Sequence, residues 1–177
     1  MNSERSEMIM ATIVEAAQNG RLGGLTIEYW VGGGQPPPYY RSEQFRVSEK
    51  DSVDQMVFSI LRFDDRYEPP QLSETFSLPA RRENIQTIAQ LLIAASPFSH
   101  QFPEENNPGN PSAISTELIV SSGEDRVEKR FFGSVPEALV PLSNEVTRLI
   151  EKTEAEGEHC WYHNGERVPN PEGERHP

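Results

Sequence analysis

The chain has 177 residues, a length that fits one domain with extended ends better than two full-sized domains. Its 28 acidic residues outnumber its 16 lysines and arginines and give a formal net charge of −12. Binding to nucleic acid or to an anionic membrane surface needs clustered basic residues, so the composition argues against both of these functions.

The first third of the chain predicts one helix followed by three strands. Residues 6–18 carry apolar side chains at helical spacing and stop at an Asn-Gly pair, a common helix end. Residues 25–31 are rich in β-branched and aromatic side chains and lie between glycines, which predicts a strand. A second strand begins near Phe45, and the alternation over residues 55–63 predicts a third.

The middle of the chain predicts a short strand, a helix and a long loop. Residues 72–78 follow a Pro-Pro break and favour a strand. Apolar side chains recur every three or four residues across 85–95, which predicts a helix. Residues 99–113 hold three prolines, three asparagines and a glycine without an apolar period, and this composition is typical of an exposed loop.

The last part predicts a hairpin and a final helix. Strands at 118–120 and 127–132 flank a short polar connection, as in a hairpin with a longer turn. The final helix begins near Pro136 or restarts at Pro141. The resulting fold class is α+β, with a largely antiparallel sheet of about five or six strands and two or three helices packed on one face.

The domain organisation follows from the same patterns. Residues 1–20 hold the N-terminal helix, and residues 21–155 form a single compact α+β domain that includes the loop at 99–113. Residues 156–177 are acidic and contain three prolines, so we expect a mostly mobile tail with a short hairpin in it.

The most unusual segment places three glycines before three prolines and two tyrosines. Glycine permits many backbone angles, proline favours an extended path, and tyrosine gives a large contact area at low entropic cost. The segment is interpreted as a recognition edge for another protein, as a ligand of WW-type domains, or as prolines that end the first strand and block edge pairing. The candidate partner-binding residues are Gly33, Gly34, Pro36, Pro37, Pro38, Tyr39 and Tyr40, together with Trp161.

The stretch from 158 to 163 contains two imidazoles and one thiol. A closed zinc site needs four ligands, and the Asn-Gly pair that follows breaks the helix that would bring the two histidines together, so no metal site is predicted. Asn-Gly instead favours a hairpin in which Cys160 and Tyr162 face opposite to Trp161 and His163. Such a hairpin would dock on the domain or on a partner.

Catalysis is not expected. The sequence has no nucleophile-elbow, phosphate-loop, zinc-protease or dinucleotide motif. Cys160 could pair with His159 or His163, but its acidic surroundings disfavour the thiolate that a nucleophile needs. We expect no enzymatic activity and no cofactor.

The expected location is cytoplasmic. No apolar run approaches the roughly 18 residues of a membrane span, and the acidic start of the chain, with Glu15 inside its apolar run, is unlike a secretory signal. The single cysteine cannot form an intramolecular disulfide, in agreement with a reducing compartment.

Residues 25–95 resemble a family of uncharacterised bacterial proteins. The likeness is carried by LTIEYWVGGGQPPPYYRSEQFRV, by the turn DDRYEPP, and by SETFSL followed by a helix. The signature of that family runs Gly-Gly, a short gap, and then Pro-Pro-Pro-Tyr with further aromatics. The resemblance implies a shared fold and leaves the function open.

The layout of the elements also resembles that of emfourin-type inhibitors of thermolysin-like metalloproteases. The shared features are a strand ending in Gly-Gly, a central helix, a two-stranded hairpin and a final helix, here VPEALVPLSNEVTRLI. This chain differs in its N-terminal helix, proline triplet, 99–113 loop and acidic tail, and no inhibitory residue is carried over from the family.

Two functions are therefore expected. The first is a non-catalytic cytoplasmic protein-binding module, an accessory or adaptor subunit that recognises its partner through the 32–40 edge, the 99–113 loop or the acidic tail. Its acidic surface favours a basic or metal-bearing protein partner through complementary charge. The alternative is a proteinaceous inhibitor of a thermolysin-like metalloprotease, which would place an exposed loop in the protease cleft.

Overall fold

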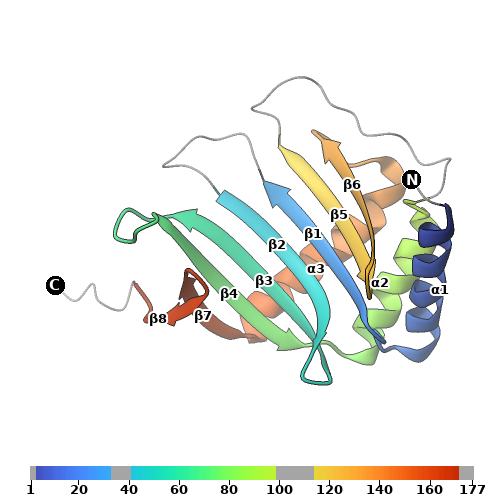
Figure 1. Cartoon of the computed structure of the whole chain (residues 1–177), viewed down its shortest axis with the longest axis horizontal. Coiled ribbons are helices and arrows are strands. Elements are labelled where there is room, and N and C mark those ends of the chain that lie inside the picture. The colour runs from blue at the N-terminus through green and yellow to red at the C-terminus, as the bar shows by residue number, and fades with distance from the viewer. Residues whose placement is uncertain (1–2, 33–40, 99–113, 172–177) are drawn as a thin grey trace.

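The computed structural model describes residues 3–32, 41–98 and 114–171 of the chain. These residues form eight strands, three α-helices and one short 3-10 helix (Figure 1). In chain order the elements are α1 (Ser3–Asn19), β1 (Leu25–Gly32), β2 (Arg41–Lys50), β3 (Val53–Phe63), β4 (Gln71–Pro79), α2 (Arg82–Ala95), β5 (Ser115–Ser122), β6 (Asp125–Phe132), η1 (Glu137–Leu139), α3 (Val140–Glu156), β7 (Glu158–His163) and β8 (Glu166–Val168).

The strands form one sheet in the order β6-β5-β1-β2-β3-β4-β7-β8, and every neighbouring pair is antiparallel. The α+β class and the antiparallel sheet are confirmed. The expected count of five or six strands is wrong, because the described residues form eight. The two additional strands are β7 and β8, the hairpin predicted in the C-terminal tail, which extend the sheet beyond β4.

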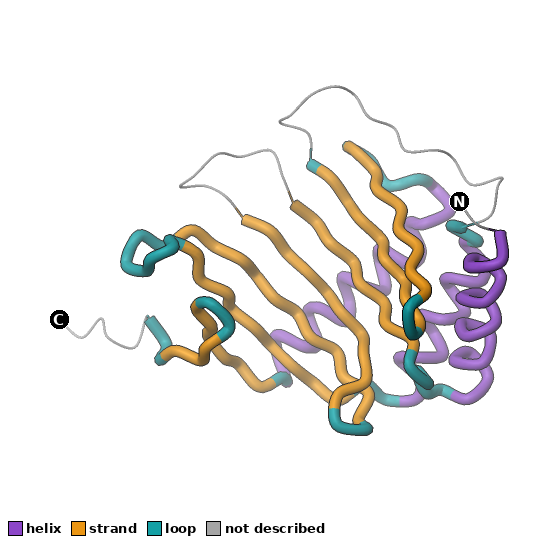
Figure 2. Tube along the Cα trace, viewed as in Figure 1, coloured by secondary structure: helices purple, strands orange, loops and turns teal. Residues whose placement is uncertain are grey.

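Alternation along the strands decides which face of the sheet is covered. In β1, Leu25, Ile27 and Tyr29 are buried, and the register pairs Tyr29 with Phe45 on the same face. These side chains belong to one core cluster with apolar residues of α1, α2 and α3. Figure 2 shows α2 and α3 behind the sheet, with α1 packed beside α2 near β6. The helices therefore cover one face, as the sequence predicted.

The helix ends follow from local chemistry. α1 ends before Gly20, whose φ of +65° suits glycine, and a Cβ there would collide with the side chain of Arg82 at the start of α2. α2 is capped by Asn84, whose side-chain oxygen accepts a hydrogen bond from the backbone of Arg81 at 3.1 Å. Both predicted starts of the last helix are seen, because η1 follows Pro136 and α3 has a proline in its first turn.

The C-terminal hairpin is formed by β7 and β8. Its turn residues Asn164 and Gly165 have φ of 50° and 78°, as a two-residue turn between twisted antiparallel strands requires. β7 pairs along its length with β4, so residues 158–168 belong to the sheet instead of to a mobile tail. Residues 172–177 of the expected tail lie outside the described residues. No helix in the described ranges is long and apolar enough to cross a membrane.

Candidate protein-binding face

The partner-binding residues proposed from the sequence fall in two places. The Gly-Pro-Tyr segment at 33–40 and the loop at 99–113 lie outside the described residues. Trp161 is described and lies on β7, where only 6% of it is exposed. Its register partner is Glu74 on β4, and its ring contacts that of His159. Trp161 is thus packed within this chain, in line with the hairpin docking on its own domain.

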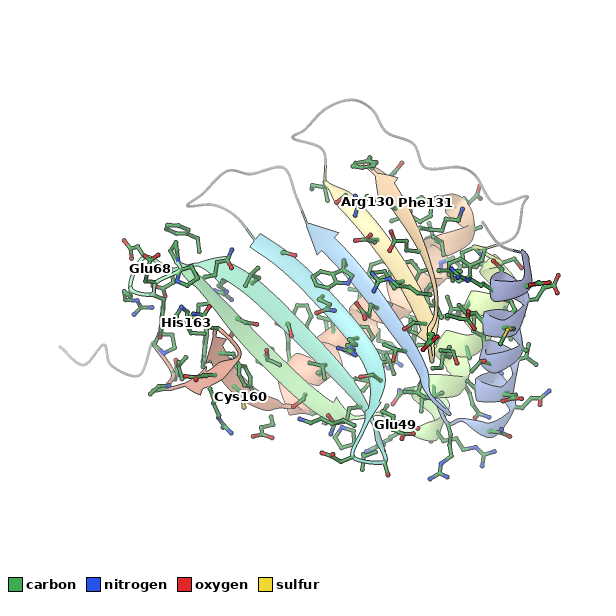
Figure 3. All side chains as sticks on the ribbon, in the orientation of Figure 1. Glu49, Glu68, Arg130, Phe131, Cys160 and His163 are labelled. Carbon is green, nitrogen blue, oxygen red and sulfur yellow. The ribbon has the colours of Figure 1, made fainter. Side chains whose placement is uncertain are left out.

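The sheet face opposite the helices carries a mixed set of polar, charged and apolar side chains (Figure 3). We call it the uncovered face, because no described helix packs against it. The strand registers assign to it Thr26, Glu28, Trp30, Gln44, Arg46, Val57, Ser59, Leu61, Ser73, Thr75, Glu117, Ile119, Arg126, Glu128, Arg130, Cys160 and Tyr162.

Trp30 is half-buried on the uncovered face, near the end of β1, the third strand in the sheet order. Its indole N–H donates a hydrogen bond to Oε2 of Glu28 at 3.0 Å, and the amide of Gln44 donates to the same oxygen at 3.1 Å. One carboxylate thus holds two neighbouring side chains. Because the indole is already anchored, its orientation is defined before anything binds.

Further polar pairs lie in the same row of the sheet on either side of Trp30. The register places Glu117 beside Trp30, and Arg130 donates a hydrogen bond to Glu117 at 3.0 Å. On the other side, the hydroxyls of Ser59 and Thr75 are 3.3 Å apart. The row therefore joins an arginine, a tryptophan and a set of hydroxyls, a combination that suits contact with another protein.

A charged cluster of Arg62, Glu74 and His159 ties three strands together at the opposite face. Oε1 of Glu74 lies 2.9 Å from Nε2 of His159, and Oε2 lies 2.5 Å from Nη2 of Arg62. The Glu74 side chain is 9% exposed, whereas those of Arg62 and His159 are 43% and 40% exposed. The imidazole stacks on Phe76 with ring centroids 4.2 Å apart. This cluster was not predicted from the sequence, although a glutamate between Leu72 and Phe76 in an alternating strand was a signal for it.

Cys160 and the two histidines face opposite sides of β7, as the predicted hairpin required. The thiol is buried on the uncovered face, with Sγ 3.5 Å from the carboxylate of Glu158. Nε2 of His163 instead lies 3.0 Å from the backbone oxygen of Pro69. Burial, together with the neighbouring Cys160, raises the pKa of Tyr162. The thiol thus lies beside a carboxylate and away from an imidazole base, which does not favour thiolate chemistry.

Within the described ranges, no group of three or more histidine, cysteine, aspartate or glutamate side chains is arranged to hold a metal ion. No known protein-family model matches this chain, and a search of curated proteins finds no match. The function is therefore proposed from the uncovered face and its chemistry.

Proposed function

We propose that the chain is a non-catalytic cytoplasmic protein-binding module, an accessory or adaptor subunit whose partner docks on the uncovered face. The observation that carries this proposal is the anchored Trp30. It lies half-buried between Glu28, Gln44 and the Arg130–Glu117 pair on a face without a described helix.

Tryptophan and arginine are the residues that most often dominate binding energy at protein interfaces, especially near the centre of the contact. The hydrogen bond from Trp30 to Glu28 removes rotamer freedom before association. The entropic cost of ordering this side chain is therefore smaller at the moment of binding. On the same face, Ile119 lies beside Glu28 in the strand register and is 4% exposed.

The chemistry of the partner follows from charge. A formal net charge of −12 creates a field that attracts a basic protein and raises its association rate. This attraction weakens at high salt, because ions screen charges that are more than about 8 Å apart at physiological ionic strength. We infer that the partner is a basic protein whose association rate falls with salt.

The test is a pull-down with the intact chain, read by quantitative mass spectrometry, followed by affinity measurements with the purified partner. Trp30→Ala is expected to weaken binding at least about tenfold, as a central tryptophan does. Met8→Ala is the matched control, because Met8 is 61% exposed on α1, away from this face. We expect that control to bind within about twofold of the parent chain.

A second bait separates the uncovered face from the edge proposed from the sequence. It carries alanine in place of Pro36, Pro37, Tyr39 and Tyr40. If this bait loses the partner and Trp30→Ala keeps it, the binding surface is the 33–40 segment. If both variants bind like the parent chain, neither surface is the interface.

Protease inhibition is the second candidate, supported by the order of the elements. β1, α2, the β5–β6 hairpin and α3 follow one another as in the layout that resembles emfourin-type inhibitors. Such an inhibitor would suppress a thermolysin-like metalloprotease at near-equimolar ratio and remain intact. Full protease activity at a tenfold excess of this chain, or rapid cleavage of the chain, would reject this candidate.

A further inference from the structure

A cavity of about 240 Å³ lies between α3 and the covered side of β1, β2 and β5. Half of its ten lining residues are apolar, with Val31, Phe45 and Val146 among them. Four hydroxyl-bearing side chains, Tyr29, Thr116, Ser143 and Thr147, also line it. An apolar cavity with a few convergent polar groups is the usual form of a small-molecule site.

Tyr29 and Ser143 fix one polar corner of the cavity. The phenol of Tyr29 donates a hydrogen bond to Oγ of Ser143 at 3.0 Å, and Tyr29 is 5% exposed. Burial raises the pKa of this phenol, with the Ser143 contact acting weakly the other way, so Tyr29 remains a neutral donor near neutral pH. Ser143 accepts this bond and keeps its own proton for another acceptor.

Thr116 provides the second polar group. It is 5% exposed, it lines the cavity, and no residue in the described ranges forms a hydrogen bond with its hydroxyl. Among the described residues, the buried side-chain atoms without a hydrogen-bond partner are Arg62 Nε and Glu74 Oε2, so the Thr116 oxygen is not fully buried and can be reached from the cavity that this residue lines. The hydroxyl of Thr116 is therefore available to a molecule in the cavity that carries a hydrogen-bonding oxygen.

We propose that this cavity binds a neutral single-ring alcohol, with its ring among the apolar walls and its oxygen bonded to Thr116 and Ser143. The size fits, because a cavity of about 150 Å³ already accepts benzene and this one is larger. Glu43 also lines the cavity, and the chain is acidic overall, so an anionic ligand is disfavoured. This site lies on the helix side of the sheet and is independent of the uncovered face.

The test uses three probes on the intact chain: benzyl alcohol, toluene and benzoate. Saturable chemical-shift changes in proton–nitrogen correlation spectra report binding at residues of β1, β5 and α3. We expect benzyl alcohol to bind about three to ten times more tightly than toluene. This ratio of dissociation constants corresponds to the net free energy of one hydrogen bond. Benzoate is expected not to bind.

Thr116→Val tests the hydroxyl, because it keeps the shape of the side chain and removes the oxygen. We expect it to abolish the preference for benzyl alcohol over toluene. Thr26→Val is the matched control, since Thr26 lies on β1 with its side chain on the uncovered face. This control should keep the preference of the parent chain.

Any one of three results would overturn the proposal that the cavity binds a neutral alcohol. Absence of saturable binding of both toluene and benzyl alcohol to the parent chain would mean that the cavity holds only water. A preference that persists in Thr116→Val would show that the hydroxyl does not recognise the ligand. Binding of benzoate as tight as that of benzyl alcohol would exclude a site for neutral molecules. The first and third measurements use the unmodified chain, so they do not depend on whether a variant folds.

Discussion

Glu74 and His159 are 85 residues apart in the chain, yet Oε1 of the glutamate lies 2.9 Å from Nε2 of the histidine. The contact joins β4 to β7, and Arg62 on β3 approaches the other carboxylate oxygen. One buried carboxylate therefore connects the C-terminal hairpin to two strands from the middle of the sheet.

Replacing Glu74 by alanine is expected to lower the free energy of unfolding by about 1–3 kcal/mol, because it leaves two cationic or polar partners without their acceptor. The lower part of this range is favoured, since Arg62 and His159 are each about two-fifths exposed and water screens them. Urea unfolding followed by circular dichroism measures the effect. Glu128→Ala is the control, because its pair with Arg126 is more than half exposed on both sides. Equal losses in the two variants would contradict a special role for Glu74.

Stability is expected to fall in alkali partly through Tyr29. Burial raises the pKa of its phenol above the usual value near 10, so the unfolded chain releases this proton first. The stabilising contribution is complete below pH 10 and is lost as the pH rises through the higher native pKa. Tyr29→Phe should flatten this alkaline decline and cost about 0.5–1.5 kcal/mol at neutral pH through the lost bond to Ser143.

Thermal melts between pH 7 and 11 measure this effect. The pKa of Tyr162 is also raised by burial, so Tyr162→Phe provides a second comparison and the double variant should be the flattest. A profile that is unchanged in Tyr29→Phe would show that this phenol titrates alike in the folded and unfolded states.

Gly157 is expected to tolerate no side chain. It separates α3 from β7, and a Cβ there would collide with the backbone oxygen of Thr153 and lie 2.9 Å from that of Ser77. Backbone atoms cannot move aside as a side-chain end can, so Gly157→Ala should cost roughly 2–4 kcal/mol. Gly165→Ala is the matched control, with open space around its Cβ and only the strain of a positive φ, about 1 kcal/mol. A smaller loss for Gly157→Ala than for Gly165→Ala would refute the close approach.

The thiol of Cys160 reports on the hairpin. It is 7% exposed, so a thiol reagent such as Ellman's reagent should react slowly with the native chain and completely after unfolding. Trp161→Ala should accelerate this reaction at least about tenfold, because removing a buried tryptophan costs about 3–5 kcal/mol and loosens β7. Trp30→Ala, on β1, should leave the rate nearly unchanged. Reaction of the parent chain at the speed of a small thiol would contradict the burial of Cys160.

Much of the fold could be predicted from periodicity. The helix at 85–95, the alternating strand at 55–63 and the hairpin before the last helix carry local patterns that the structure repeats. β7 has no comparable pattern, because two histidines and a glutamate occupy half of its six positions. It becomes a strand through its pairing with β4, which is a nonlocal contact that no short window of sequence contains.

The candidate sites also differ in whether local or nonlocal contacts form them. Glu28, Trp30 and Gln44 lie on two neighbouring strands of one antiparallel pair, so a prediction of their contact needed only the register. The cluster of Arg62, Glu74 and His159 needs three strands and the return of the chain after α3. Glu74, between Leu72 and Phe76 in an alternating strand, signals a buried charge, but the sequence does not identify the two partners that it meets only when the sheet is assembled.

The strand order also sets the sequence of events during synthesis. β4 pairs with β7, and β1 pairs with β5, so each of these strands has one edge that stays open while more than 75 further residues are added. Pairings over such distances close late and slow folding. The nascent chain therefore exposes two strand edges together with the apolar side chains of β1 until these late pairings form.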